Sequence, residues 1–171
     1  MEIEIIKGIN SALSCPFADA FFKGITTLGN GGAVWIFIAV VLLCFKKTRA
    51  AGLSLSISLI FCLLIGNLTL KPIIARPRPF DADLNLVPLI PPPTDFSFPS
   101  GHTLSSFAAA TSLTLSFKKR GALAFILAAL IAFSRLYLMV HYPSDVLFGI
   151  ILGIFLAYLA KKVFDFISHK C

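Results

Sequence analysis

The sequence predicts an all-α fold, a polytopic membrane helix bundle with about six transmembrane helices in a single domain over residues 1–171. Two observations lead to this fold class. Hydrophobic residues make up 57% of the chain and charged residues 13%, whereas a soluble domain carries about 25% charged residues. The apolar residues are also gathered into stretches long enough to cross the hydrocarbon core of a bilayer, which is about 30 Å thick.

Six apolar stretches follow one another along the chain: 9–28, 30–45, 50–70, 102–117, 121–139 and 145–164. The third is the clearest span, because residues 50–70 hold no charge and suffice as a helix to cross about 30 Å. The fifth is nearly as apolar. The second, fourth and sixth have shorter apolar cores, which need snorkelling flanks or local thinning of the bilayer. The first contains Asp19 and Lys23 on one helix face, so it either spans the bilayer or lies partly in its interface.

The basic residues between the apolar stretches predict the orientation of the bundle. Clusters at 46–49, 118–120 and 161–170, the last including Lys170, follow the second, fourth and sixth stretches. With six spans, these clusters, both chain termini and Lys7 fall on one side of the membrane, which the positive-inside rule assigns to the cytoplasm. The net charge of +7 therefore reflects topology, and nucleic-acid binding is not expected.

The segment 71–101 is the one substantial loop, and it falls on the extracytoplasmic side. Eight of the ten prolines lie within 72–99. Proline fixes φ and removes a backbone donor, so we expect a stiff loop here instead of a further helix.

Gly149 and Gly153 in the last apolar stretch are spaced for close helix packing. The pair suits a dimer face or, as the preferred interpretation, another helix of the same chain. The oligomeric state is left open.

Three polar groups lie at the extracytoplasmic ends of the predicted helices, where charge is costly and usually functional. The first is the segment 71–79, which contains Lys71, Arg76 and Arg78. Arginine offers a planar fork of donors that matches phosphate oxygens, and lysine adds a point charge. Anchoring to lipid head groups is the alternative interpretation of these cations.

The second group is Pro99-Ser100-Gly101-His102, at the start of the fourth stretch. A helix that begins here leaves free backbone N–H groups and the positive end of its dipole facing outward, an arrangement that binds phosphate oxygens. His102 would stand in the first turn, where it can give a proton to the same anion. An ordinary capped helix start with an interfacial histidine is the alternative.

The third group runs from Ser134-Arg135 to His141 and Asp145. Pro143 fits the opening turn of the sixth helix, so Asp145 lies close enough to bond one imidazole nitrogen of His141. Such a bond fixes the tautomer and leaves the other nitrogen free to attack. A lone interfacial histidine beside a helix N-terminal aspartate is the alternative. Together the three groups supply the nucleophile, proton donor and cations that phosphoryl transfer needs.

These motifs resemble those of the type 2 phosphatidic acid phosphatase family, which shares its site with vanadium-dependent haloperoxidases. That family carries Lys, six residues, Arg-Pro; then Pro-Ser-Gly-His; then Ser-Arg, five residues, His, three residues, Asp. The chain has all three motifs in order over residues 71–145: Lys71 with Arg78-Pro79, Pro99-Ser100-Gly101-His102, and Ser134-Arg135 with His141 and Asp145.

The resemblance implies a membrane phosphatase that works through a phosphohistidine, without a metal or other cofactor. It implies that His141 attacks phosphorus while Asp145 orients it, and that His102 protonates the leaving alkoxide and then activates water. The groups that it assigns to the phosphate oxygens are Lys71, Arg78, Ser100, the Gly101 backbone N–H and Arg135. Arg76 lies between matched positions and is kept only as a further candidate.

The substrate implied by the resemblance is a phosphate monoester or pyrophosphate of a membrane lipid, hydrolysed on the extracytoplasmic face. The candidate lipids are phosphatidylglycerol phosphate, undecaprenyl pyrophosphate, phosphatidic acid and lipid A 1-phosphate, without a ranking. The small size favours a bacterial enzyme of the cell membrane. A lipid-to-lipid phosphotransferase with the same site is the alternative function. A transporter is disfavoured, because the charges gather at one interface and we find no inverted repeat.

Overall fold

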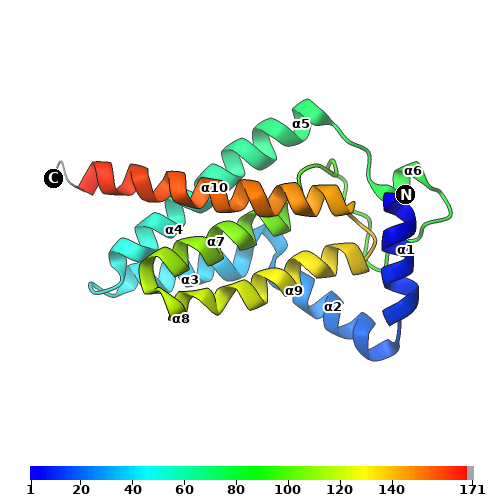
Figure 1. The fold of residues 1–171 in the computed structure, drawn as a ribbon, viewed down its shortest axis with the longest axis horizontal. Coiled ribbons are helices and arrows are strands. Elements are labelled where there is room, and N and C mark those ends of the chain that lie inside the picture. The colour runs from blue at the N-terminus through cyan, green and yellow to red at the C-terminus, as the bar shows by residue number, and fades with distance from the viewer. Residues whose placement is uncertain (169–171) are drawn as a thin grey trace.

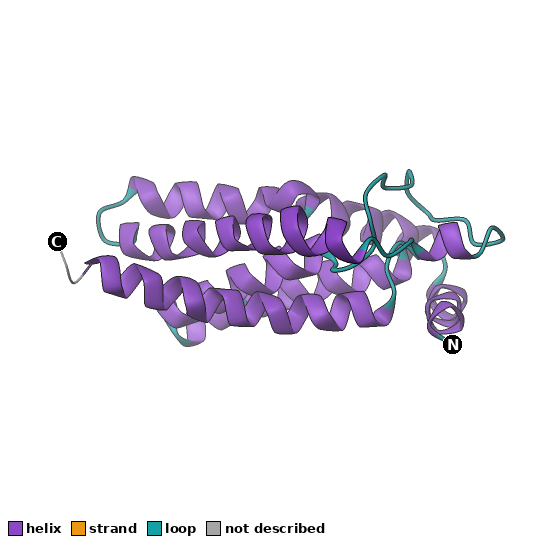
Figure 2. Ribbon diagram, turned by 90° about the horizontal axis from the view of Figure 1, so that it is seen from above, coloured by secondary structure: helices purple, strands orange, loops and turns teal. Residues whose placement is uncertain are grey.

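The fold is described from a computed structural model, which describes residues 1–168, and every regular element in this range is helical (Figure 2). Lys170 of the third basic cluster lies outside these residues. In chain order the elements are α1 (Glu2–Leu13), α2 (Pro16–Leu28), η1 (Asn30–Gly32), α3 (Ala33–Cys44), α4 (Arg49–Phe61), η2 (Cys62–Leu70), α5 (Lys71–Ile74), α6 (Pro79–Ala82), α7 (Gly101–Phe117), α8 (Lys119–Ala122), α9 (Ala124–Tyr137) and α10 (Pro143–Ser168).

The first predicted stretch, 9–28, is divided between two helices. α1 carries Glu2 and Glu4 in its first turn, where they interact favourably with the positive end of the helix dipole, and it ends before the extended Ser14. Pro16 then opens α2, at a position that tolerates the missing proline N–H. α1 lies across one end of the bundle and does not continue the direction of α2 (Figure 1).

α2 and α3 form one rod that is bent by 44° at the break between them. Gly31 and Gly32 form this bend with φ angles of +58° and +73°, a conformation that glycine adopts without the strain of a Cβ atom. By length and composition α2 and α3 qualify as a membrane span only as a pair, so two separate spans over 9–28 and 30–45 are not confirmed.

Within the described residues, three helical stretches are long and apolar enough to cross a membrane, and the bent α2–α3 pair is a fourth if it counts as one span. The three are Arg49–Ala82, Lys119–Tyr137 and Pro143–Ser168. The all-α membrane bundle is thus supported, but the count of about six spans is not confirmed.

α7 lies in the middle of the bundle, where it packs against α4, α9 and α10. Its alanines at 108–110 are fully buried, and their small side chains allow the neighbouring helices to come close. On α10, a Cβ atom added to Gly153 would lie 2.6 Å from the carbonyl oxygen of Leu104, and one added to Gly149 would meet Thr103 at 3.2 Å. This contact confirms the preferred interpretation of the glycine pair as packing within the chain.

The segment 71–101 has only the one-turn helices α5 and α6 before α7 begins, as its prolines predict. It gathers with α1 at the end of the bundle where α9 gives way to α10 (Figure 1). The N-terminus lies at this loop end and the C-terminal end of α10 at the opposite end, whereas the sequence predicts both termini on one side. The prediction for Lys7 is wrong for the same reason, since its Nζ atom donates to Asp83 of the loop at 2.6 Å.

Candidate active site

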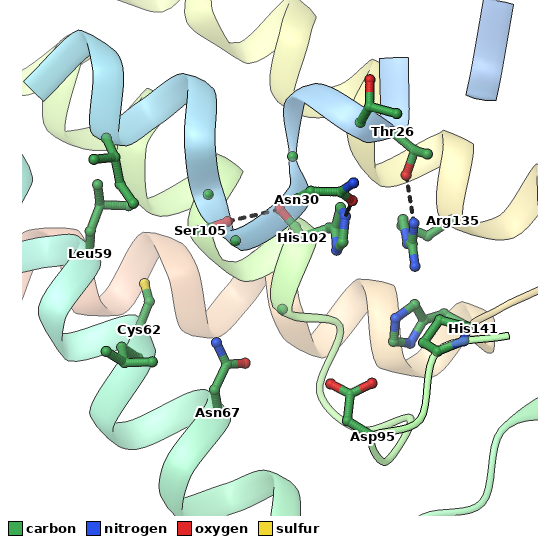
Figure 3. Close-up of a pocket in the computed structure, with 18 of the residues that line it drawn as sticks. Thr26, Asn30, Leu59, Cys62, Asn67, Asp95, His102, Ser105, Arg135 and His141 are labelled. Atoms are coloured by element: carbon green, nitrogen blue, oxygen red, sulfur yellow. Dashed lines mark hydrogen bonds between the residues drawn. The ribbon is translucent and has the colours of Figure 1, made fainter. Parts of the chain in front are cut away.

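A cavity of about 1130 Å³ opens at the loop end of the bundle (Figure 3). Its polar part includes these residues: Asn67, Lys71, Arg78, Asp95, Gly101, His102, Arg135 and His141. Its remaining walls include apolar side chains of α3, α4 and η2, which we call the apolar branch: Ile36, Ala39, Val40, Leu59, Ile60 and Leu63. The three predicted motifs therefore converge on one space that continues between helices.

Three buried cations face this space, and we call Lys71, Arg78 and Arg135 the cation cradle. Their relative exposures are 7%, 2% and 2%. Lys71 begins α5, Arg78 precedes α6, and Arg135 lies in the last turn of α9. Buried charge is costly unless it is paired, and the cradle holds more positive charge than the single carboxylate of Asp95 can balance. The cavity is therefore suited to an anion.

His141 lies beside the cradle, in the short segment between α9 and α10. Its Nδ1 atom is 3.4 Å from Asp145 Oδ2, and its Nε2 atom is 3.3 Å from Arg78 Nη1. Arginine only donates hydrogen bonds and a carboxylate only accepts them. We therefore assign the proton to Nδ1, which leaves the Nε2 lone pair on the side of the cradle.

The surroundings of His141 keep its ring neutral. Burial, the largest effect, lowers its pKa; the hydrogen bond to Asp145 raises it; and the positive charges of Arg135 and Arg78 lower it again, to about 3. At neutral pH the ring thus carries a free lone pair, which a nucleophile requires.

Asp145 is held by more groups than the sequence pattern shows. Its Oδ2 atom accepts hydrogen bonds from the Tyr142 backbone N–H at 3.0 Å and from the Ser97 hydroxyl at 2.5 Å. Its Oδ1 atom accepts from Arg76 Nη1 at 2.6 Å. Arg76 therefore binds the carboxylate on its side away from His141, and it is not among the residues that line the cavity.

Arg76 in turn joins the N-terminus to this group. Its Nη2 atom pairs with Glu2 Oε2 at 2.7 Å, while Glu2 Oε1 accepts from the Ser144 backbone N–H at 2.9 Å. The guanidinium also lies 3.8 Å from the centre of the Tyr142 ring. α1 is thus attached through one arginine to the residue that orients His141.

Of the residues predicted to face the phosphate at the start of α7, only some reach the cavity. His102 and Gly101 line the cavity, and His102 Nε2 lies 2.9 Å from Asn30 Oδ1 of η1. Ser100 is buried beside the cavity, but its hydroxyl pairs with Thr103 Oγ1 at 3.0 Å and its backbone N–H donates to the Asp145 carbonyl. The structure therefore brings Gly101 and His102 to the cavity and leaves the Ser100 hydroxyl engaged elsewhere.

Several polar residues at the site lie outside the three motifs. Thr26 accepts from Arg135 Nη1, and the buried atoms Arg135 Nε and Asn67 Oδ1 have no hydrogen-bond partner among the described residues. Buried polar atoms are nearly always paired, so these two atoms suit a bound ligand or water. Asn67 and Lys71 are four residues apart on one helical segment, a spacing that sequence alone could have used. Asn30 and Thr26 come from distant segments and carry no such signal.

Residues 1–168 contain no group of three or more His, Cys, Asp or Glu side chains arranged to hold a metal ion. The cradle, the neutral His141 and His102 are the groups that line the cavity and can take part in chemistry. They can bind an anion with several oxygens and present one nitrogen lone pair to it.

The fold and the cavity define a class: an apolar helix bundle of the membrane type with a cavity lined by buried cations at one end. Residues 51–168 match the model of the PAP2 superfamily, and the chain belongs to this superfamily.

Named relatives agree with this assignment. An undecaprenyl-diphosphatase of Sulfolobus acidocaldarius is 40% identical over 131 residues, which make up 76% of this chain and 63% of that protein. This chain thus spans less than two thirds of that relative. A lipid A 4'-phosphatase of Bacteroides thetaiotaomicron is 30% identical, with 96% of this chain and 74% of that protein covered.

Among solved structures, a PAP2-type phosphatidylglycerolphosphate phosphatase from Bacillus subtilis superposes with a TM-score of 0.75 and 28% identity. The superposition covers 95% of this chain and 83% of that chain. The family and these relatives indicate a hydrolase that acts on phosphate esters.

Proposed function

We propose that the chain hydrolyses a lipid phosphate, either a monoester or a diphosphate, through a phosphohistidine formed on His141. The observation that carries the proposal is the position of His141. Its Nε2 atom lies 3.3 Å from Arg78 Nη1, and its ring lines the same cavity as Lys71 and Arg135. In phosphoryl transfer negative charge spreads over three equatorial oxygens, and cations beside the nucleophile stabilise that charge.

In the first step Nε2 of His141 attacks phosphorus, a P–N bond forms, and the bond from phosphorus to the leaving oxygen breaks. His102 takes up a proton that the phosphate group brings into the site and gives it to that oxygen. Asp145 accepts the Nδ1–H and stabilises the positive charge that develops on the ring. The cation cradle and the Gly101 N–H hold the oxygens of the phosphoryl group, and by the resemblance Ser100 joins them after its hydroxyl turns from Thr103.

In the second step water replaces His141 on phosphorus. His102, now neutral, accepts a proton from the attacking water, the P–N bond breaks, and inorganic phosphate is released. The hydrogen bond between His102 and Asn30 fixes the plane of the ring for both proton transfers.

The apolar branch supports a lipid as the substrate. It continues from the cradle along α3 and α4, where Ile36, Val40 and Ile60 are about half exposed. An acyl or isoprenoid chain in this branch would bury apolar surface, which stabilises the bound state by about 25 cal/mol per Å² of area removed from water. The relatives named above act on undecaprenyl diphosphate, lipid A and phosphatidylglycerol phosphate, which are three of the four lipid classes in the candidate set; the fourth is phosphatidic acid.

We also propose that the loop end faces the cell exterior or periplasm. The basic clusters at 46–49 and 118–120 and the lysines at 161–162 lie at the opposite end of the bundle, which the positive-inside rule assigns to the cytoplasm. In this orientation the N-terminus is outside and the C-terminal end of α10 inside. Membrane-impermeant thiol labelling of Asn85→Cys and Lys47→Cys, each in a cysteine-free background, tests it. If position 85 is labelled from the cytoplasmic side alone, the proposed orientation is wrong.

The test of the function is phosphate release by purified protein in EDTA. The panel is phosphatidylglycerol phosphate, undecaprenyl pyrophosphate, phosphatidic acid, and lipid A with either its 1- or its 4'-phosphate, with His141→Ala as control. We expect release from at least one lipid, unchanged by EDTA and abolished in the variant. Loss of activity in EDTA would overturn the metal-free mechanism, and no release from any lipid would overturn hydrolysis. A radiolabelled donor with an acceptor lipid then detects the alternative, because phosphotransfer leaves the label in the organic phase.

A further inference from the structure

Asp95 is the one carboxylate among the described residues that line the cavity. Its Oδ1 atom accepts a hydrogen bond from Arg78 Nη2, and its Oδ2 atom accepts one from Lys71 Nζ, both at 2.5 Å. Each carboxylate oxygen therefore holds one cation of the cradle. Two oxygens of a phosphate would adopt the same arrangement with the same two side chains, so the Asp95 carboxylate stands where a phosphate would bind.

The Asp95 side chain is better placed to leave this position than its partners are. It is 53% exposed, whereas the side chains of Lys71 and Arg78 are 9% and 3% exposed. In Figure 3 the carboxylate points from the loop into the cavity, towards the space between Asn67 and His141. Solvent is therefore available to the carboxylate once it rotates outward, while the two cations stay buried.

The backbone around Asp95 is fixed, so a side-chain rotation is enough to empty the position. The Asp95 carbonyl accepts from Arg78 Nε at 2.8 Å. Two residues later, the Ser97 N–H donates to the Arg76 carbonyl at 2.9 Å. These bonds keep the loop in place whether or not the carboxylate occupies the cradle.

Asp95 is charged whenever the site is empty. Burial alone would raise the pKa of its carboxyl group, but the ion pairs with Lys71 and Arg78 lower it to about 2. At neutral pH an incoming anion therefore meets a cradle in which two of three cations are already paired. It must displace one negative charge to bind.

We propose that Asp95 is a selectivity residue that competes with phosphate for Lys71 and Arg78. The inference rests on the proposed function of the cradle as a phosphate site. Inorganic phosphate and small soluble monoesters bind through the cradle alone, so they bear the full cost of displacing Asp95. A lipid phosphate also buries its chain in the apolar branch, and this second source of binding energy offsets the cost.

The same competition favours release of the product. After hydrolysis inorganic phosphate has no attached chain, and Asp95 rotates back to the two cations as phosphate leaves. The residue therefore limits inhibition by free phosphate and protects soluble phosphate esters at the membrane surface from hydrolysis.

The experiment compares wild type, Asp95→Asn and Asp83→Asn. Asp83 lies in the same loop, but it pairs with Lys7 and does not line the cavity, which makes it a matched control. Binding of inorganic phosphate is measured directly by isothermal titration calorimetry. Its inhibition constant against lipid hydrolysis is measured separately. KM values are compared for a lipid phosphate and for p-nitrophenyl phosphate.

In Asp95→Asn we expect the dissociation and inhibition constants of phosphate to fall at least tenfold. The KM of p-nitrophenyl phosphate should fall more than that of the lipid, and Asp83→Asn should stay within twofold of wild type. Asp95→Ala is a second variant without the charge and must tighten phosphate binding in the same way. Phosphate binding that is unchanged, weaker or undetectable in both Asp95 variants overturns the proposal. If Asp95 only stabilises the fold, its replacement would lower the melting temperature and leave phosphate binding no tighter.

Calorimetry separates this inference from the proposed function. If neither wild type nor any variant hydrolyses lipid but phosphate binds more tightly to Asp95→Asn, the proposed hydrolysis is refuted and the role of Asp95 stands. If the lipid is hydrolysed and phosphate binding does not respond to Asp95, the reverse holds.

Discussion

Replacement of Arg76 by alanine tests the link between the N-terminal helix and His141. Asp145 has a fully buried side chain, and among residues 1–168 Arg76 is the cationic side chain that contacts its Oδ1 atom. A hydrogen bond to a charged group contributes about 1.5–3 kcal/mol. Because the Arg76 side chain is 27% exposed, water would replace part of that contact, and we expect a loss of about 2 kcal/mol in the free energy of unfolding.

The same substitution should lower turnover more than substrate binding. Without Arg76, Asp145 holds the His141 ring less firmly, and a loss of about 1.4–2.8 kcal/mol in the transition state corresponds to a roughly 10- to 100-fold decrease in kcat. KM should change little, because Arg76 does not line the cavity.

Steady-state hydrolysis of the best lipid, with melting curves in the same detergent, measures both effects. Arg76→Lys keeps the charge but loses the fork that binds Glu2 and Asp145 together, so its kcat should lie between the other two proteins. A variant in which KM rises and kcat is unchanged would show that Arg76 binds substrate, and an unchanged kcat and KM would refute its positioning role.

Three further predictions concern pH, packing and the apolar branch. The pKa of His141 lies at about 3 and that of an unfolded histidine at about 6.5, so the unfolded chain binds more protons at pH values between them. The contribution of His141 to stability should therefore fall as pH drops, by about 2 kcal/mol between pH 8 and pH 5. Melting curves of His141→Gln should show a smaller decrease. Gly153→Ala should lower the melting temperature by roughly 5 °C, since the new Cβ would meet backbone atoms of α7; Gly8→Ala, with open space around it, should not lower it. Ile36→Trp should raise KM for a long-chain lipid roughly fivefold and leave hydrolysis of a short-chain analogue unchanged, and equal effects on both would argue against a chain in the apolar branch.

Much of the site follows from local sequence, because each motif is short and lies at a helix end. Lys71 and Arg78 flank a proline-rich turn, and Asp145 follows His141 by four residues across the start of α10, so their proximity depends on few residues. The prediction that the motifs meet required only that the intervening stretches be helices of similar length.

The contacts that sequence reasoning missed are long-range. Asp95 appears in the sequence as one more polar residue of a loop, and only the fold brings it to Lys71 and Arg78. Lys7 pairs with Asp83, 76 positions away, so it lies at the loop end of the bundle and not beside the basic clusters, as the sequence predicted. Residues 9–28 are divided at Ser14 by Pro16, which opens α2; this is a local backbone signal, which hydropathy alone does not detect.

The most direct test of the central proposal is to trap the covalent intermediate. Purified protein is mixed with lipid labelled with ³²P on the phosphoryl group to be transferred, quenched in alkali within one turnover, and digested for mass spectrometry. We expect an acid-labile phosphoryl group on His141, absent from His141→Ala and longer-lived in His102→Ala. Label on another residue, or hydrolysis that continues in His141→Ala, would contradict it.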